Sequence, residues 1–190
     1  MVTRVTSDAD LVAAAASGDH SAYATLVRLH ADAVYAHALR FFGDVPTAED
    51  ATQEVFLKVF RSLGSFDGRA RLSTWLYRVT RNVCLDMVRA GKRTPLPLDP
   101  VDLEPLSQAD FSDDVAFAGA LEVAIATLPP EEREALGAVG LFGLTYAEAS
   151  GTLGIPEGTV KSRVFRARRA LTHILRMAEG GDHDGLPQSG

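Results

Sequence analysis

The side chains with the clearest chemical capacity lie near the end of the chain, where cations are concentrated between residues 157 and 176. Six basic residues occur there against a single acidic residue, Glu157. The basic residues are Lys161, Arg163, Arg166, Arg168, Arg169 and Arg176. Ammonium and guanidinium groups bind phosphate oxygens and the edges of guanine bases, so this segment has the composition of a nucleic-acid contact. A solvated basic face on a surface helix is the alternative interpretation.

Two helices joined by a tight turn are predicted to hold these cations in place. Thr145 and Glu148 have the spacing of a capping box at the start of the first helix. Gly154 can take the left-handed conformation that ends a helix, and Pro156 suits the first turn of the next one. The second helix has an apolar stripe with the helical period, made of Val160, Val164, Ala167, Leu171 and Ile174. This pattern is typical of a helix-turn-helix whose second helix enters the major groove of DNA.

A second cationic region lies in the first half of the chain, between residues 55 and 93. It contains nine basic residues against two acidic ones, within a chain whose formal net charge is −6. A region of this charge and size is expected to attract nucleic acid. Trp75 lies inside it and could either stack on an unpaired base or belong to the core. The loop that carries Phe66, Asp67 and Gly68 could line a pocket for a base extruded from the duplex.

Four amphipathic helices are predicted to position this second region and to form one domain over residues 9–93. They cover approximately residues 10–17, 22–42, 46–63 and 72–89, with Ser21 as the cap of the second helix. A second helical domain, ending in the helix-turn-helix, is predicted over residues 118–177. The expected fold class is therefore all-α, with two small helical domains.

The segment that joins the two domains, residues 94–117, has the composition of an extended acidic linker. It contains four prolines and six acidic residues, and it has no lysine or arginine. Residues 1–8 and 178–190 are predicted to be disordered ends of the chain.

Residue types needed for catalysis do not come together in the sequence. Cys84 is the single cysteine, and no His/Cys cluster, HExxH spacing or phosphate-binding glycine loop occurs. His30 and His37 could share a helix face, which is more often a structural arrangement than a metal site. We therefore expect no enzyme activity, no metal and no cofactor. A single cysteine and the lack of a long apolar run favour a cytoplasmic protein without membrane contact of its own.

Several stretches resemble the sigma-70 family of bacterial transcription factors, specifically its extracytoplasmic-function (group IV) class. Residues 48–58 (AEDATQEVFLK) are similar to the helix that binds core polymerase. Residues 66–69 (FDGR) and 74–86 (TWLYRVTRNVCLD) look like the segment that recognises the −10 promoter element. Residues 128–135 and 158–168 are similar to the domain that binds the −35 element. The presence of two sigma domains alone is what marks this class.

The resemblance implies that the chain directs RNA polymerase to promoters, with each surface contacting a different target. The residues implied in binding core polymerase, through its β′ and β subunits, are Asp50, Gln53, Glu54, Phe56 and Lys58. Those implied in holding the single-stranded −10 element are Phe66, Asp67, Gly68, Arg69, Arg71, Trp75, Arg78, Arg81 and Asn82. Those implied in reading the −35 duplex are Thr159, Lys161, Ser162, Arg163, Arg166 and Arg169. An anti-sigma factor is implied as the regulator, and the linker would enter the active-site cleft of the polymerase.

Two other classes of protein remain open on the residues alone. A stand-alone helix-turn-helix regulator would explain the C-terminal motif, but it would not need a second basic domain with an exposed loop. A DNA-processing enzyme would need metal ligands that the sequence lacks.

Gly137 and Gly140 depart from the resemblance, because the family usually has larger apolar residues at these positions. Each glycine costs roughly 0.5–1 kcal/mol in a helix interior. We therefore expect the C-terminal domain to be marginally stable alone and to be firmed by a partner.

Overall fold

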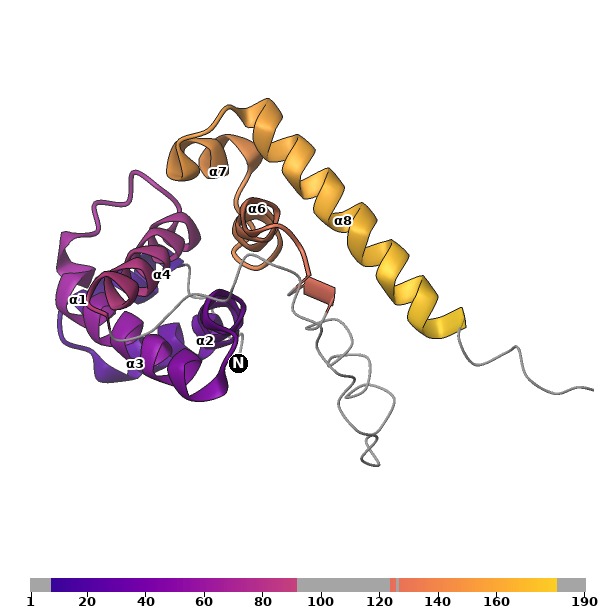
Figure 1. Cartoon of the computed structure of the whole chain (residues 1–190). Helices are drawn as coiled ribbons and strands as arrows, with labels where there is room; N and C mark the ends of the chain where they lie inside the picture. The colour runs from indigo at the N-terminus through magenta and orange to yellow at the C-terminus, as the bar shows by residue number, and fades with distance from the viewer. Residues whose placement is uncertain (1–7, 92–123, 126, 181–190) are drawn as a thin grey trace, which may run out of the picture.

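The computed structural model describes residues 8–91, 124–125 and 127–180, which form helices joined by short loops (Figure 1). The helices are α1 (Asp8–Ala16), α2 (His20–Phe42), α3 (Val45–Ser62), the short 3-10 helix η1 (Leu63–Ser65), α4 (Leu72–Arg89), α6 (Pro130–Gly140), α7 (Tyr146–Leu153) and α8 (Glu157–Gly180). Since these ranges contain no strand, the predicted all-α class is confirmed. The predicted linker and nearly all of the two predicted disordered ends lie outside the described residues; Asp8 belongs to α1, and residues 178–180 belong to α8.

Helices α1 to α4 form the N-terminal domain, and their ends follow from local side-chain chemistry. The carboxylate of Asp19 accepts hydrogen bonds from the backbone N–H groups of Ser21 and Ala22 at 2.8 and 3.1 Å. Asp19 is therefore the cap of α2, and the prediction of Ser21 was wrong by two residues, because both are good cap-forming types. Gly43 ends α2 with a left-handed φ of +78°, and the carboxylate of Asp44 caps α3.

The core of the N-terminal domain lies where α2, α3 and α4 pack together. Its centre consists of apolar side chains that are at most 1% exposed: Leu26, Val34, Val55, Val59 and Leu76. A neighbouring cluster contains small residues, among them Ala48, Ala51 and Cys84, which allow the helix backbones to approach closely. This packing fixes α3 and α4 as rigid platforms for the polar residues on their outer faces.

Helices α6 to α8 form the C-terminal domain, and its helix-turn-helix has the predicted construction. The hydroxyl of Thr145 accepts from the N–H of Glu148 at 3.2 Å, and the Glu148 carboxylate accepts from the N–H of Thr145 at 2.8 Å. This reciprocal capping box confirms the predicted start of α7. Gly154 ends α7 with a φ of +70°, and the carbonyl of Pro156 accepts from the N–H of Val160 at the start of α8.

Helix α8 packs on α6 and α7 through only part of its apolar stripe. Val160, Val164 and Ala167 are at most 1% exposed, as predicted. Leu171 and Ile174 are only half-buried, because the second half of α8 extends past the rest of the described domain (Figure 1).

The two domains pack against each other, with α6 and α7 beside α2 and α4 (Figure 1). Phe142, which follows α6, is 5% exposed, and its ring centre lies 5.9 Å from His37 and 5.2 Å from Tyr77. These contacts join residues of both domains into one continuous apolar cluster. The sequence carried no prediction of this arrangement.

Candidate nucleic-acid and polymerase surfaces

The first turns of α8 present an exposed polar face. Lys161 Nζ lies 2.8 Å from Glu157 Oε1 and 5.7 Å from the ring centre of Tyr146. The hydrogen bond with Glu157 raises the pKa of Lys161, so the ammonium group stays charged. The hydroxyl of Ser162 donates to the carbonyl of half-buried Thr159 at 3.0 Å. Lys161 and Ser162 are therefore exposed and locally oriented, as a groove-binding helix requires.

One arginine of α8 is paired with an acidic residue of α6, and two others have no such partner among the described residues. Arg166 Nε lies 2.6 Å from the carboxylate of Glu132, a residue of α6 that is only 8% exposed. Arg163 is half-buried and Arg169 is exposed, and no ion pair within the described residues engages either of them. Arg166 therefore connects α8 to α6, whereas Arg163 and Arg169 are not held by an ion pair within the described residues.

The loop before α4 is shaped by its own side chains. The Asp67 carboxylate accepts from the N–H of Arg69 at 3.0 Å, and its other oxygen pairs with the Arg69 guanidinium at 3.2 Å. Gly68 takes a left-handed φ of +69° between them. The ring centre of Phe66 lies 5.4 Å from Trp75, which is half-buried against the core. Of the two roles left open for Trp75, this packing favours the core.

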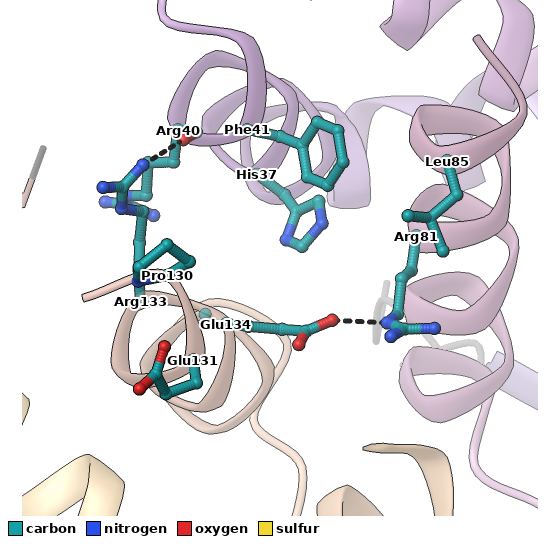
Figure 2. Close-up of a pocket in the computed structure, with 10 residues that line it drawn as sticks. His37, Arg40, Phe41, Arg81, Leu85, Pro130, Glu131, Arg133 and Glu134 are labelled. Atoms are coloured by element: carbon teal, nitrogen blue, oxygen red, sulfur yellow. Dashed lines mark hydrogen bonds and ion pairs between the residues drawn. The ribbon is translucent and has the colours of Figure 1, made fainter. Parts of the chain in front are cut away.

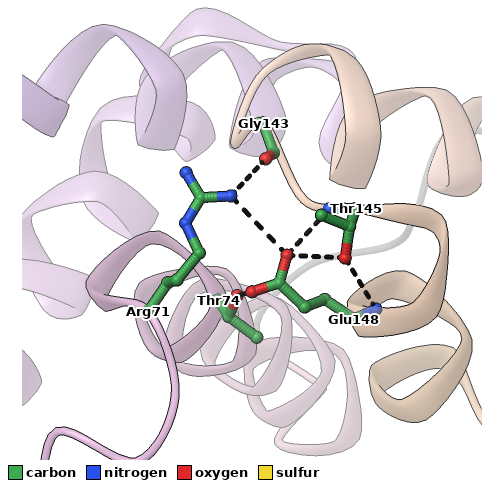
Figure 3. Close-up of polar contacts among 5 residues, drawn as sticks. All are labelled: Arg71, Thr74, Gly143, Thr145 and Glu148. Atoms are coloured by element: carbon green, nitrogen blue, oxygen red, sulfur yellow. Dashed lines mark hydrogen bonds and ion pairs between the residues drawn. The ribbon is translucent and has the colours of Figure 1, made fainter.

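Arg71, the residue before α4, is exposed, and its guanidinium points toward Gly143 and Glu148 of the C-terminal domain (Figure 3). Its Nη1 donates to the carbonyl of Gly143 at 3.0 Å and lies 3.6 Å from the Glu148 carboxylate. The hydroxyl of Thr74 donates to the same carboxylate at 2.9 Å. The hydrogen bond from the N–H of Thr145, helped by these neighbours, lowers the pKa of Glu148. Glu148 is therefore an ionised acceptor shared by both domains.

Two further arginines of α4 make contacts of the same kind. Arg78 Nε donates to the hydroxyl of Thr152 in α7 at 3.2 Å. Arg81 forms an ion pair and hydrogen bond with Glu134 of α6 (Figure 2). Asn82 is exposed. Three of the arginines that the sequence assigned to the −10 element are thus engaged by the second domain.

The outer face of α3 carries the residues expected to bind polymerase, with one correction. Asp50, Gln53 and Glu54 are exposed, and Lys58 pairs with Asp86 at 3.4 Å. Phe56 is only 9% exposed and lies in the core, so the structure contradicts its place on this surface; its carbonyl accepts from the hydroxyl of Tyr23 at 2.6 Å.

Two apolar residues that sequence reasoning missed lie on the outer face of α3 instead. Leu57 is 50% exposed and Phe60 is 51% exposed. Their exposure is a property of the folded chain, so the sequence alone did not single them out. A large apolar side chain left in water often marks a contact with another protein.

A cavity of about 360 Å³ lies between the two domains (Figure 2). Its walls include His37, Phe41 and Leu85 on one side and Glu134 and Gly137 on the other. Burial, followed by the charges of Arg40 and Arg81, lowers the pKa of His37 to about 4, so the imidazole is neutral. A Cβ added at Gly137 would lie 3.5 Å from the imidazole Nδ1. A large side chain at Gly137 would therefore push α6 away from α2.

Neither a metal site nor a membrane span emerges from the described residues. They contain no group of three or more histidine, cysteine, aspartate or glutamate side chains that could hold a metal ion. None of their helices is both long and apolar enough to cross a bilayer. Burial raises the pKa of the Cys84 thiol to about 12.

Two all-α domains with cationic faces, one a helix-turn-helix and the other bearing arginines beside an exposed loop, define a DNA-binding transcription protein. Residues 26–94 match the family model described as sigma-70 region 2, and residues 118–171 match the one described as sigma-70 region 4. The chain is 39% identical to the ECF RNA polymerase sigma factor SigM of Mycobacterium tuberculosis, over 89% of this chain and 85% of the relative. The chain therefore belongs to the extracytoplasmic-function sigma factors of RNA polymerase.

Other relatives agree with this assignment. The chain is 39% identical to SigE of Mycolicibacterium smegmatis, over 84% of this chain and 65% of that relative. It is 32% identical to the ECF sigma-E factor of Escherichia coli, over 90% of this chain and 95% of the relative. The fold is similar to the sigma factor RpoE of Bartonella quintana, solved in complex with the anti-sigma factor NepR, with a TM-score of 0.60. That likeness covers 81% of this chain and 96% of the solved chain at 24% identity, and it concerns the fold alone.

Proposed function

We propose that this sigma factor brings core polymerase to promoters through three separate surfaces. The face of α8 reads the −35 duplex, α4 and its preceding loop hold the single-stranded −10 element, and the outer face of α3 binds core. The observation that carries the proposal is that one chain combines two cationic faces, on α4 and α8, with a third face on α3. This third face presents both polar side chains and exposed apolar ones. A stand-alone helix-turn-helix regulator would need only the face of α8.

For the −35 surface, Lys161, Arg163 and Arg169 are the proposed contacts, with Thr159 and Ser162 beside them. Arg166 takes a positioning role, because its guanidinium is bound to Glu132. For the −10 surface, the loop of Phe66, Asp67, Gly68 and Arg69 takes an extruded base, and Arg71, Arg78, Arg81 and Asn82 hold the strand. Extruding a base costs a few kcal/mol, which phosphate contacts can offset. Catalysis belongs to the polymerase, and this chain supplies promoter specificity in the cytoplasm.

The core-binding surface comprises Asp50, Gln53, Glu54 and Lys58, joined by Leu57 and Phe60. The proposed target is the β′ subunit, with β nearby. A rigid amphipathic helix that lays one face into a groove is a recurrent mode of binding. An anti-sigma factor would inhibit by covering the same face, since Leu57 and Phe60 leave apolar surface exposed in the free chain.

Run-off transcription with purified core polymerase and fragmented genomic DNA tests the proposed function directly. Discrete new start sites that share elements near −35 and −10 are the expected result. Binding to duplex DNA without any binding to core would overturn the proposal and favour a stand-alone regulator.

The double variant Asp50→Ala with Gln53→Ala tests the surface on α3. It should lower the affinity for core and leave the helical circular dichroism unchanged, because both side chains are exposed. Asp32→Ala is the matched control, since Asp32 is an exposed acid on α2. Equal affinity of both variants for core would remove this face from the assignment.

A further inference from the structure

Helix α8 carries one acidic residue on the face proposed to bind the −35 duplex. Glu157 is the first residue of α8 and the only acidic residue between positions 157 and 176, where six basic residues occur. The first turns of a recognition helix are the part that contacts base edges in the major groove. A carboxylate in these turns repels the phosphates of DNA, so its position calls for a favourable contact that offsets the repulsion.

The carboxylate of Glu157 is held against Lys161, one turn further along α8. Glu157 Oε1 lies 2.8 Å from Lys161 Nζ, and the side chains of the two residues remain 46% and 56% exposed. An exposed pair of this kind stabilises a helix only slightly. The helix dipole favours an acid in this turn, but it does not explain why the carboxylate holds a lysine. The clear effect of the pair is on orientation, because it keeps an anionic acceptor and a cationic donor side by side.

Tyr146 of α7 contacts the same ammonium group from the other helix of the motif. Lys161 Nζ lies 5.7 Å from the centre of the Tyr146 ring, a distance at which the face of an aromatic ring attracts a cation. The ring is half-buried and packs against the apolar core, and α7 lies beside the first turns of α8 (Figure 1). Because it has partners on two helices, Lys161 has less freedom than an isolated surface lysine.

Gly158 leaves open space beside this pair. It lies three residues before Lys161, so a side chain at position 158 would share a face of α8 with the ammonium group. Among the described residues, a Cβ added at Gly158 would have nothing within 4 Å outside its own turn of the helix, and its φ is not left-handed. Neither packing nor backbone conformation within the described residues therefore requires a glycine. A glycine lowers the stability of a helix, and its benefit here is the close approach of another molecule.

The spacing of the two charged groups matches the major-groove edge of one base pair. In a G·C pair, the amino group of cytosine and O6 of guanine lie side by side, joined by a hydrogen bond of about 2.9 Å. Glu157 Oε1 and Lys161 Nζ are 2.8 Å apart, and they supply the acceptor for cytosine N4 and the donor for guanine O6. Lysine on guanine and glutamate on cytosine are the preferred pairings of these residues.

An A·T pair satisfies this arrangement less well. Adenine N6 can donate to the carboxylate, but thymine O4 is then the single acceptor for the ammonium group, and the thymine methyl group lies next to it. Guanine offers the ammonium group both O6 and N7. The pair of Glu157 and Lys161 therefore favours G·C over A·T.

We propose that Glu157 and Lys161 form a single recognition site for one G·C pair of the −35 element, in which the carboxylate accepts from the amino group of cytosine and the ammonium group donates to guanine. Glu157 is thereby a specificity-determining residue, since its carboxylate rejects a base pair that places an acceptor opposite it. This inference rests on the proposed binding of the −35 duplex by α8.

The test is selection of duplexes randomised across the −35 element by the full chain in complex with core polymerase, followed by sequencing of the bound fraction. Wild type should prefer a G·C pair at one position, in one orientation, by about ten-fold. Glu157→Ala should reduce the preference at this position alone by about five-fold. The affinity averaged over all sequences should not fall, because the change also removes repulsion of phosphates. Glu131→Ala, at an exposed acid of α6, is the matched control and should leave the preference intact.

Three further variants test the coupling between the two residues. The losses from Glu157→Ala and Lys161→Ala should fall on the same base pair and should not add in the double variant, because each side chain orients the other. Tyr146→Leu should also weaken the preference, whereas Tyr146→Phe keeps the aromatic face and should behave like wild type. Independent losses at different base pairs would overturn the shared site.

Failure of the proposed function gives a different result from failure of this inference. A wild-type preference that Glu157→Ala leaves unchanged would overturn the inference alone, and so would a loss that falls on an A·T pair. An equal change on every sequence would also overturn it, because a carboxylate that only repels phosphate or stabilises the helix has that effect. A wild-type chain that binds all duplexes alike would overturn the −35 function of α8, and the inference would fall with it.

Discussion

The cationic faces of α4 and α8 carry the same kind of side chain but differ in the partners of their arginines. On α8, Lys161 and Arg169 face solvent. On α4, Arg71, Arg78 and Arg81 face the other domain of the same chain. Duplex DNA is always available to bind, whereas a single strand exists only after melting. The contrast shows that side chains of one type can stabilise the contact between the domains on α4 and remain without a partner from the other domain on α8.

The largest expected effect on stability comes from removing the apolar contact between the two domains. Phe142→Ala should lower the free energy of unfolding by about 3–5 kcal/mol, because it leaves a cavity beside His37 and Tyr77. Phe165→Ala, on α8, is the control. Phe165 is 65% exposed, so its loss should cost less than about 0.5 kcal/mol. Urea unfolding measures both free energies, and equal losses would contradict the burial of Phe142 between the domains.

Acid should lower the free energy of unfolding through His37, which lies at the contact between the domains. Burial lowers the folded pKa of His37 to about 4, whereas an unfolded histidine titrates near about 6.5. Between these values the unfolded chain binds a proton that the folded chain does not. The free energy of unfolding is therefore complete above about pH 6.5 and falls by roughly 2–3 kcal/mol as the pH drops toward the folded pKa.

Urea unfolding across this pH range tests the role of His37. His37→Gln should remove this part of the pH dependence. His173→Gln should retain it, because His173 is exposed on α8. A pH profile that is the same in His37→Gln and wild type would contradict the assignment.

On α8, Arg163→Ala should weaken binding to the −35 duplex by about 1–3 kcal/mol if the guanidinium forms hydrogen bonds with a base edge. Fluorescence anisotropy with the native and a scrambled −35 sequence measures the effect. A loss confined to the native sequence would support a base-specific contact by Arg163 on α8. An equal loss on both sequences would reduce Arg163 to a phosphate contact.

The smallest expected effect separates the anchored arginine of α8 from an exposed one. Arg166→Ala leaves the buried carboxylate of Glu132 without its partner, so the free energy of unfolding should fall by about 1 kcal/mol. Arg169→Ala should change stability little and reduce DNA binding only. Thermal unfolding of the two variants distinguishes these roles, and identical melting temperatures would place Arg166 on the DNA-reading face.

The features that could be predicted from the sequence are those whose causes lie close together in the chain. The capping box of Thr145 and Glu148 and the helix end at Gly154 depend on contacts within a few residues, and both were predicted correctly. The prediction of a buried stripe on α8 was correct only where another helix packs against it. Leu171 follows the same period and is half-buried, because α8 there extends past the rest of the domain as far as the structure describes it.

The remaining features depend on contacts between distant parts of the chain. The contact of Phe142 with His37 joins residues from two domains, and no local pattern announces it. Phe56 was placed on the polymerase-binding face, although the packing of α2 on α3 buries it and leaves Leu57 and Phe60 outside. The arginines of α4 were correctly recognised as a cationic group, but their engagement by Glu134 and Glu148 required the tertiary structure.

Glu148 has a consequence for how such a protein can change over evolutionary time. Its one carboxylate both builds the start of α7 and bonds Arg71 and Thr74 across the domain boundary. A substitution at this position that weakened the contact between the domains would therefore also damage the helix-turn-helix. Glu134 and Thr152 contact α4 but do not cap the helices that carry them. Natural variation in the strength of the contact between the domains should accumulate at those two positions, while position 148 stays restricted to residues that can cap a helix.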